Sequence, residues 1–299
     1  MVMLGVLLPA LFVTFVAVSA SHEEEAYKYL RAYHYISPTR SGNYDFNIAI
    51  RNFQHFMGLP VTGNVDGATI KMMRKPRCGV ADVEDGAFKT RRRRYSVFGS
   101  KWSKTHLTYY LQHGQDLPRS TQNRVIERAL QYWSEVSPLT FSRVGHPSQA
   151  DLKMSFGPRT HEGTSEENTC RYPFDGEGGV LAHAFAPSDG RLHFDEEETF
   201  TDLSEQGTNL LYVAVHEIGH NLGLRHSSVR DAVMYPAYLG YKPDLKLHSD
   251  DISGIQSLYG SGGGALCADK RDDCANYQDR CNEIKNYMRE HCRATCNFC

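Results

Sequence analysis

The chain has 299 residues, enough for two or three compact units, and 40% of them are hydrophobic, which suffices for one sizeable core. The formal net charge is −2 at pH 7, so we expect no broad basic surface and no nucleic-acid partner. Six of the eight cysteines lie between Cys267 and Cys299, which indicates an oxidising, extracellular compartment rather than the cytosol.

The amino-terminal segment is almost wholly apolar from Val2 to Val18. It leads into Val18-Ser19-Ala20, where small residues stand at the position that signal peptidase recognises. Since no Lys or Arg precedes the apolar run, a signal anchor is the competing interpretation. We expect residues 1–20 to be the signal peptide of a secreted protein.

Residues 21–94 form a polar region with a helical pattern. Its apolar residues at helical spacing predict an amphipathic helix that Gly58 stops. The residues of that predicted face are Ile48, Ile50, Phe53, Phe56 and Met57. On pattern alone this region is a small helical bundle.

Cys78 stands alone in the segment Lys75–Asp82. A lone cysteine in a secreted chain can be a dimer-forming or unpaired thiol. If a zinc site with three histidines lies downstream, the Cys78 thiolate is instead the natural fourth ligand, and it would displace a catalytic water.

A basic run, Lys89 to Arg94, follows that segment. Elsewhere it would suggest nuclear localisation or heparin binding. Behind a signal peptide and between two folded units, cleavage by a proprotein convertase is favoured. Cutting after Arg94 would make Tyr95 the new amino terminus.

Residues 95–260 combine strands and helices. Leu107–Leu111 and Asp151–Phe156 are strand-like, and Asp250–Tyr259 is a short helix. One buried helix face, ended by Pro138, is predicted from Val125, Ala129, Leu130, Trp133 and Val136. The Gly-rich residues 261–266 read as a flexible linker.

Three histidines in this unit carry the chemistry. His216 and His220 are four residues apart, so on a helix they share one face and can share a metal. Gly223 can take the left-handed conformation that turns the chain and brings His226 close as a third ligand. Three protein nitrogens and one exchangeable water make a catalytic zinc site, and Glu217 beside the open position is the candidate base.

This spacing, HExxHxxGxxH with Met234 downstream, is the extended metzincin pattern. Ser227 after the third histidine and the turn Val233–Pro236 resemble the matrixins, or matrix metalloproteinases, more than astacins, adamalysins or serralysins. The resemblance implies an α+β fold with a twisted mixed sheet and three helices. It also implies a metalloendopeptidase that hydrolyses extracellular or matrix proteins, with tissue inhibitors of metalloproteinases as further partners.

The resemblance extends to the preceding region. Ala49–Pro60 resembles the peptidoglycan-binding-like helical prodomain of matrixins, and Lys75–Asp82 resembles their cysteine switch, PRCGxPD, with Ala81 in place of proline. It therefore implies that Cys78 ligates the catalytic zinc in a latent form, at an effective concentration of about a millimolar. After cleavage, the ammonium of Tyr95 would pair with an aspartate of the last helix; Asp250 and Asp251 both remain candidates.

Substrate contacts are implied in the same way. Gly178–Phe185 resembles the matrixin edge strand, whose backbone groups at Leu181 and Ala182 pair with an extended substrate. Pro236 to Tyr238 would form the outer wall of the S1′ pocket, with Tyr212 at its base. Because Tyr212 is bulky, we expect a preference for apolar P1′ side chains of modest length.

The matrixins also hold calcium and a structural zinc near this strand. The calcium ligands implied here are Asp175, Gly176, Gly178, Val180, Asp195 and Glu198. His183 and His193 match two structural-zinc histidines, but the His-x-Asp that completes that site is missing. Either His161 or Cys170 substitutes, or the zinc is absent; Cys170 is otherwise a free thiol or an intermolecular link.

The six-cysteine tail, residues 267–299, is too short to fold without disulfides, and its cysteines alone leave the pairing open. Their spacing resembles the sea-anemone potassium-channel-toxin (ShKT) domain. That resemblance implies the pairs Cys267–Cys299, Cys274–Cys292 and Cys281–Cys296. The toxins' Lys-Tyr pair is not matched, since Asn286 precedes Tyr287, so an adhesive or regulatory module is favoured over a channel blocker.

The leading hypothesis is a secreted zinc endopeptidase, made as a latent zymogen and activated by a convertase. The alternative is a non-catalytic binding protein that engages a channel or matrix partner through its ShKT tail. An intact Glu217 and an intact switch argue against the alternative, because an inactive carrier would not need latency.

Overall fold

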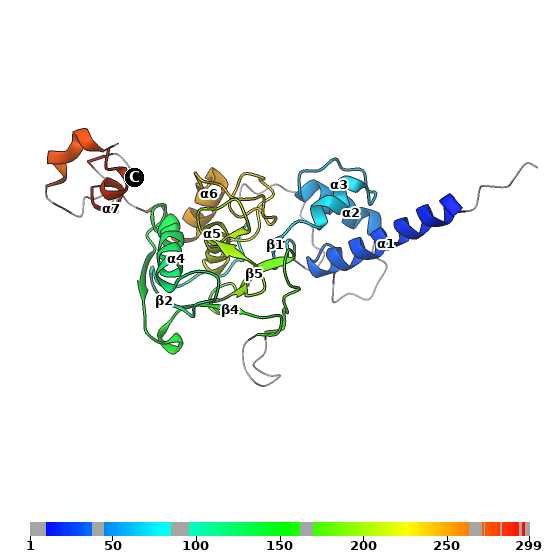
Figure 1. Cartoon of the computed structure of the whole chain (residues 1–299), viewed down its shortest axis with the longest axis horizontal. Helices are drawn as coiled ribbons and strands as arrows, with labels where there is room; N and C mark the ends of the chain where they lie inside the picture. Colours follow the sequence, from blue (N-terminus) through cyan, green and yellow to red (C-terminus); the bar gives the residue numbers. More distant parts are fainter. Residues whose placement is uncertain are drawn as a thin grey trace, which may run out of the picture.

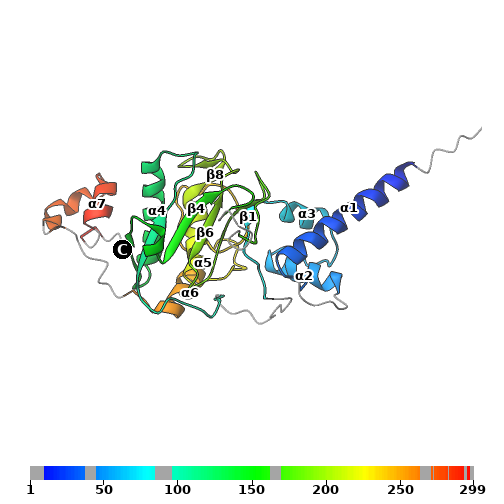
Figure 2. The same ribbon diagram turned by 90° about the horizontal axis from the view of Figure 1, so that it is seen from below.

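The computed structural model describes residues 10–37, 45–84, 96–161, 170–262, 271, 273–281, 283–292 and 295–296. The start of the predicted signal peptide, the predicted cleavage site at Arg94 and Tyr95, and Cys267 and Cys299 lie outside these residues. The described part forms an amino-terminal helical unit, a central unit of sheet and helices, and a small carboxy-terminal unit (Figures 1 and 2).

Three helices build the amino-terminal unit: α1 (Ala10–Ala32), α2 (Phe46–Phe56) and α3 (Gly67–Met73). Asp45 and Asp66 begin α2 and α3 by accepting hydrogen bonds from the backbone N–H groups of Ile48 (3.1 Å) and Thr69 (2.9 Å). Helix α1 runs across the signal-peptide boundary predicted at residue 20. None of the described helices combines the length and the apolar character that a membrane span requires.

The predicted face of α2 is correct except at Ile48. Ile50, Phe53 and Met57 are buried in the core of this unit, whereas Ile48 is 55% exposed. Ile48 and Ile50 are two positions apart, which places them on nearly opposite sides of a helix. The helix ends beside Gly58, whose φ of 66° is one that glycine adopts without strain.

The main sheet has six strands in the order β1-β5-β6-β4-β2-β3. Five belong to the central unit: β2 (His106–Leu111), β3 (Thr140–Arg143), β4 (Leu152–Gly157), β5 (Val180–Ala184) and β6 (Arg191–Asp195). The β5–β6 pair is antiparallel and the other pairs are parallel. The edge strand β1 (Arg77–Cys78) comes from the segment that follows the amino-terminal helices, so this segment completes the sheet.

Three helices pack on this sheet or close the unit: α4 (Arg119–Ser134), α5 (Leu210–Asn221) and α6 (Ser249–Tyr259) (Figure 1). The predicted α+β fold with a mixed sheet and three helices is confirmed. Trp133 of α4 is fully buried and donates a hydrogen bond from its indole nitrogen to the Val215 carbonyl of α5 (3.0 Å). A short 3₁₀ helix, η1 (Pro147–Gln149), and a two-stranded sheet, β7 (Phe200–Thr201) with β8 (Thr208–Asn209), complete the unit.

The carboxy-terminal unit contains the 3₁₀ helix η3 (Cys274–Arg280) and helix α7 (Lys285–His291). Disulfides join Cys274 to Cys292 and Cys281 to Cys296, which are two of the pairs that the ShKT resemblance implies. Its described buried residues are Cys274, Met288 and Cys292. A core this small depends on its disulfides for stability.

Candidate metal centre and substrate cleft

Helix α5 positions two of the three predicted zinc histidines. Asn209 begins the helix, with its side chain accepting from the N–H of Tyr212 (3.0 Å). The helix stops at Asn221, and Gly223 turns the chain with φ of 105°. A Cβ at Gly223 would lie 2.6 Å from the Ser100 carbonyl oxygen, so the turn requires glycine. The chain then returns and places His226 beside the helix.

The imidazoles of His216, His220 and His226 are buried and converge on one point. Their Nδ1 atoms are turned outward and bonded to oxygen: His216 to the Val233 carbonyl (2.6 Å) and His220 to the Leu224 carbonyl (2.8 Å). When Nδ1 donates its proton in this way, the lone pair on Nε2 is available to a metal. The Nε2 atoms of His216 and His220 are 3.1 Å apart.

Burial lowers the pKa of His216 to about 3 and also lowers the pKa of His220 and His226. The three rings are therefore neutral at physiological pH, which is the form that ligates metals. The buried Nε2 of His226 has no hydrogen-bond partner among the described residues, which fits an atom reserved for a cation.

Cys78 supplies a fourth candidate ligand. Its Sγ lies 3.4 Å from Nε2 of His220, and the four ligand atoms of Cys78, His216, His220 and His226 all lie within 4.8 Å of one another. We call these four residues the first centre. One thiol and three imidazoles are a donor set that suits zinc.

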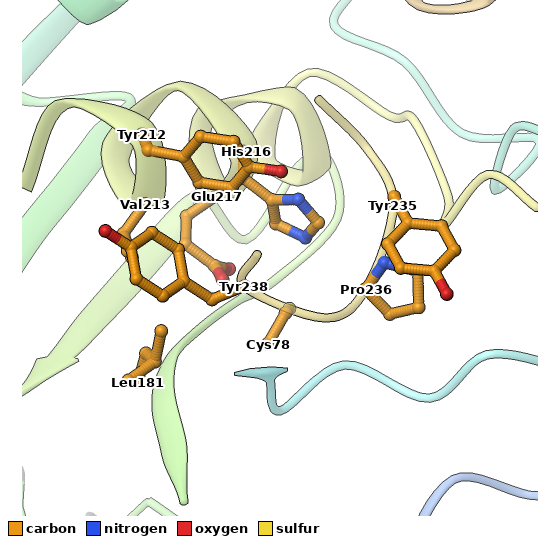
Figure 3. Close-up of a pocket in the computed structure, with 9 residues that line it drawn as sticks. All are labelled: Cys78, Leu181, Tyr212, Val213, His216, Glu217, Tyr235, Pro236 and Tyr238. Carbon is orange, nitrogen blue, oxygen red and sulfur yellow. The ribbon is translucent and has the colours of Figure 1, made fainter. Parts of the chain in front are cut away.

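Glu217 follows His216 on α5, and its carboxyl group is buried beside Cys78 (Figure 3). Its Oε2 atom has no hydrogen-bond partner among the described residues. Burial raises the pKa of Glu217 to about 8. A carboxyl group with its pKa near the working pH can both accept and return a proton, as general acid–base catalysis requires.

The segment that carries Cys78 fills the cleft beside β5. On one side, the N–H groups of Arg77 and Gly79 donate to the carbonyls of Gly179 (3.0 Å) and Ala182 (2.8 Å). On the other side, Cys78 N–H donates to the Pro236 carbonyl (3.0 Å). The segment thus pairs with both walls of the cleft, and its pairing with β5 is parallel.

Arg77 and Asp82 flank Cys78 and had no role predicted from the sequence. Oδ1 of Asp82 accepts from Nη2 of Arg77 (2.6 Å) and from Nδ1 of His226 (2.7 Å), while Oδ2 accepts from the Tyr35 hydroxyl (2.9 Å). Burial alone would raise the pKa of Asp82, but the Arg77 charge and the His226 hydrogen bond outweigh it and lower the pKa to about 2. Opposite charges on both sides of a lone cysteine were the signal that could have revealed this network.

A pocket of about 230 Å³ lies next to the first centre (Figure 3). Its lining residues are Cys78, Leu181, Tyr212, Val213, His216, Glu217, Tyr235, Pro236 and Tyr238. The Tyr212 and Tyr238 rings meet edge to face, 5.4 Å apart, and the Tyr238 hydroxyl accepts from Asn209 N–H (3.0 Å). The residues predicted for S1′, namely Tyr212, Pro236 and Tyr238, all line this pocket, and Tyr212 is buried.

Tyr235 is a further pocket residue with no role predicted from the sequence. Its buried hydroxyl donates to the Met57 carbonyl (3.1 Å), and its ring belongs to the core of the amino-terminal unit. Tyr235 therefore links the wall of the pocket to the helices that precede the switch segment.

Met234 packs against α5, the helix that carries His216 and His220. A Cβ at Gly219 of α5 would lie 2.4 Å from Met234 Sδ, so the turn packs directly against the helix. Asp251 fixes this turn, because its carboxylate accepts from the N–H groups of Val233 (2.8 Å) and Met234 (3.0 Å). The neighbouring Asp250 carboxylate accepts a hydrogen bond from the Ser227 hydroxyl (2.7 Å).

The predicted calcium ligands lie in the loops around β5 and β6. Asp175 and Glu198 accept from the N–H groups of Val180 (2.7 Å) and Gly178 (2.6 Å). Oδ2 of Asp195 is buried without a hydrogen-bond partner among the described residues. Burial raises the pKa of Asp195 and Glu198, and neighbouring carboxylates raise it further, so a cation would relieve this repulsion.

His183 and His193 face each other across the β5–β6 pair. His161 and Cys170, which the sequence left as alternatives, both join them. Cys78 and Cys170 are the two described cysteines outside disulfides.

Three family models match the chain: Matrixin over residues 101–260, a putative peptidoglycan binding domain over residues 24–73, and an ShK-like domain over residues 266–299. The chain belongs to the matrixin family. This membership supports a metalloendopeptidase activity for the central unit and implies zinc as its metal.

Individual matrixins are similar over most of the chain. Human matrilysin is 43% identical over 79% of this chain and 85% of its own length. Human matrix metalloproteinase-19 is 42% identical over 78% of this chain, and stromelysin-1 of Rattus norvegicus is 46% identical over 71%. The chain spans only 44% and 42% of the lengths of the latter two proteins.

Proposed function

We propose that this matrixin is a secreted zinc endopeptidase, held latent by Cys78, that cleaves extended segments of extracellular or matrix proteins. The observation that carries the proposal is the first centre: three buried Nε2 atoms converge beside an unpaired carboxylate oxygen of Glu217, and a thiol stands at the fourth position.

His216, His220 and His226 would hold the catalytic zinc. When bound, zinc polarises a peptide carbonyl and lowers the pKa of a coordinated water to about 7. Glu217 takes a proton from the attacking water and delivers it to the leaving amine. Its raised pKa suits both tasks, and no covalent intermediate with the protein is required.

Cys78 and its neighbours occupy the place that a substrate needs. Once the segment leaves, the carbonyls of Gly179, Ala182 and Pro236 lose their partners and can pair with an extended peptide. Leu181 and Ala182 of β5 would form one side of this cleft, and Pro236 with Tyr238 the other. The pocket above Tyr212 would receive the P1′ side chain, with apolar groups of modest length preferred.

Activation would follow convertase cleavage after Arg94. The new ammonium of Tyr95 would pair with Asp250 rather than Asp251, because Asp251 already accepts three backbone N–H groups, those of Val233, Met234 and His248. The Asp250 carboxylate accepts one side-chain hydroxyl and retains capacity for an ammonium. Tissue inhibitors of metalloproteinases would bind the cleft that the segment vacates.

Calcium would bind the carboxylates of Asp175, Asp195 and Glu198, with the carbonyls of Gly176, Gly178 and Val180. The support is the unpartnered Asp195 oxygen and the repulsion between the buried carboxyl groups of Asp195 and Glu198. Oxygen-only donors are those that calcium prefers.

The test begins with secreted full-length protein and a proprotein convertase. We expect amino-terminal sequencing to find Tyr95, and cleavage of fluorogenic peptides to appear only after convertase treatment and to disappear with a zinc chelator. The Glu217→Ala variant, prepared in the same way, should keep its zinc and lose turnover.

The same experiment tests the alternative function. If treated protein shows no chelator-sensitive peptidase activity and Glu217→Ala retains the full biological effect, the chain acts as a binding protein through its ShKT-like tail.

A further inference from the structure

A second cluster of metal-binding side chains lies behind the substrate strand. It consists of His161, Cys170, His183 and His193, and we call it the second centre. All four side chains are buried, and their ligand atoms lie within 4.8 Å of one another. The cluster is separate from the first centre, since it shares none of its residues.

The nitrogen atoms of this cluster form a close triangle. Nε2 of His161 lies 3.3 Å from Nε2 of His183 and 3.2 Å from Nδ1 of His193, and the latter two atoms are 3.0 Å apart. Sγ of Cys170 lies 3.3 Å from Nε2 of His183. For tetrahedral zinc, ordinary Zn–N and Zn–S bond lengths predict separations of about 3.3–3.6 Å between ligand atoms.

Hydrogen bonding within the triangle does not account for it. Nδ1 of His161 lies 3.0 Å from the Pro158 carbonyl and donates to it, so a neutral His161 presents a lone pair at Nε2. Protons on the other two nitrogens cannot serve every edge of the triangle at once. A shared cation satisfies all three lone pairs together.

We propose that the second centre is a closed zinc site in which the Cys170 thiolate completes the coordination by three imidazoles. The thiolate takes the place of the carboxylate that the His-x-Asp pattern of the family would supply. A soft sulfur ligand with imidazoles selects zinc over calcium or magnesium, and four protein ligands leave no position for a catalytic water.

The local structure is built to bring these ligands together. Cys170 N–H donates to the His161 carbonyl (3.0 Å), which holds these two residues next to each other. Gly157 at the end of β4 allows His161 to approach, since a Cβ there would lie 2.5 Å from His161 Cβ. Phe174 stacks on the His161 ring (centroids 4.5 Å apart) and excludes water from one side.

The position of the site gives it a role. His183 and His193 come from β5 and β6, so the metal would join these strands to each other and to His161 and Cys170. Leu181 and Ala182, which line the substrate cleft, precede His183 on β5. The second centre would therefore brace the strand on which the substrate pairs, and it would withhold Cys170 from disulfide formation between molecules.

The test measures metals and thiolate ligation directly in the latent full-length chain. Elemental analysis should find two zinc ions per chain. After replacement by Co²⁺, the near-ultraviolet thiolate-to-cobalt absorption should have two contributions, from Cys78 and Cys170. In Cys78→Ser it should fall by about half, since one of two equal thiolates is lost.

Adding Cys170→Asp to Cys78→Ser should abolish the remaining absorption, while both cobalt ions are retained because a carboxylate also ligates. Cys170→Ala should instead retain only one tightly bound metal. The Asp variant keeps the test decisive if the Ala variant does not fold. No thiolate absorption left in Cys78→Ser, or an unchanged metal content in Cys170→Ala, would overturn the proposal.

A failure of the first centre has a different signature. If the first centre binds no metal, Cys78→Ser would leave the thiolate absorption unchanged, whereas Cys170→Asp would remove all of it.

Discussion

The two centres have the same donor set, one cysteine and three histidines, yet they differ in where the cysteine comes from. In the first centre Cys78 belongs to a segment that precedes the predicted cleavage site, so maturation would take it away. In the second centre Cys170 and its histidines all lie in the central unit. Under the proposals made above, the same ligand set would supply a removable ligand in the first centre and a permanent structural ligand in the second.

The residues that surround the two centres also differ. The first centre has the buried carboxyl group of Glu217 beside it and opens onto a pocket. The second centre is enclosed by aromatic rings, with Phe174 against His161 and Phe185 against His183. The candidate proton carrier and the pocket thus lie beside the cluster whose fourth ligand would depart on maturation.

The largest expected effect comes from Glu217→Gln, which keeps the shape of the side chain and removes its proton transfer. We expect kcat/KM of the convertase-treated protein to fall by about 10²- to 10⁴-fold, the usual contribution of a general acid–base. Zinc content should stay unchanged. Activity within tenfold of the wild type would mean that Glu217 does not carry the proton.

The next largest effect is expected from substituting Cys78, compared with substituting Cys170, in a chain that cannot be cleaved. In a chain whose cleavage is blocked by Arg94→Ala, adding Cys78→Ser should raise peptidase activity by at least about a hundredfold, equivalent to ~2.7 kcal/mol. Cys170→Asp in the same background is the matched control and should remain latent. Equal activation by both substitutions would contradict the proposal that Cys78 keeps the enzyme latent while Cys170 is a structural ligand.

A smaller effect is expected from Asp82→Asn, which weakens the contacts to Arg77 and His226. Loss of a carboxylate partner to a ligating histidine typically costs ~10–100-fold in metal affinity. We expect zinc affinity of the latent chain to fall about tenfold, measured by competition with a chelator. Glu84→Gln, which removes a half-exposed partner of Arg225 on the same segment, should change it little.

The smallest effect is expected at the pocket. Tyr212→Leu should deepen the S1′ site and shift the ratio of kcat/KM for long over short apolar P1′ residues by roughly fivefold, at the low end for a change of this kind. Profiling with a P1′ peptide series measures this ratio. The Co²⁺ spectrum of the second centre should not change, and an unchanged ratio would show that Tyr212 does not limit the depth of the pocket.

Prediction from sequence succeeded where the signal was local. The i, i+4 spacing of His216 and His220, the helix stop before Gly223 and the strand at Leu107–Leu111 all have counterparts in the structure. It was wrong at Ile48, because a single apolar residue does not reveal which side of a helix faces the core. The roles of Arg77, Asp82 and Tyr235 were missed because each contacts residues far away in the sequence.

The sequence by itself determined the first centre's histidines and Glu217, since helical geometry and one glycine turn fix their relation within eleven residues. Tertiary structure decided which cysteine accompanies which histidines. Cys78 reaches His220 across 142 positions only because β1 adds to the edge of the sheet. The register of β5 and β6 places His183 opposite His193, and His161 and Cys170 both lie against His183. Such convergence depends on strand pairing between distant segments, and no local pattern encodes it.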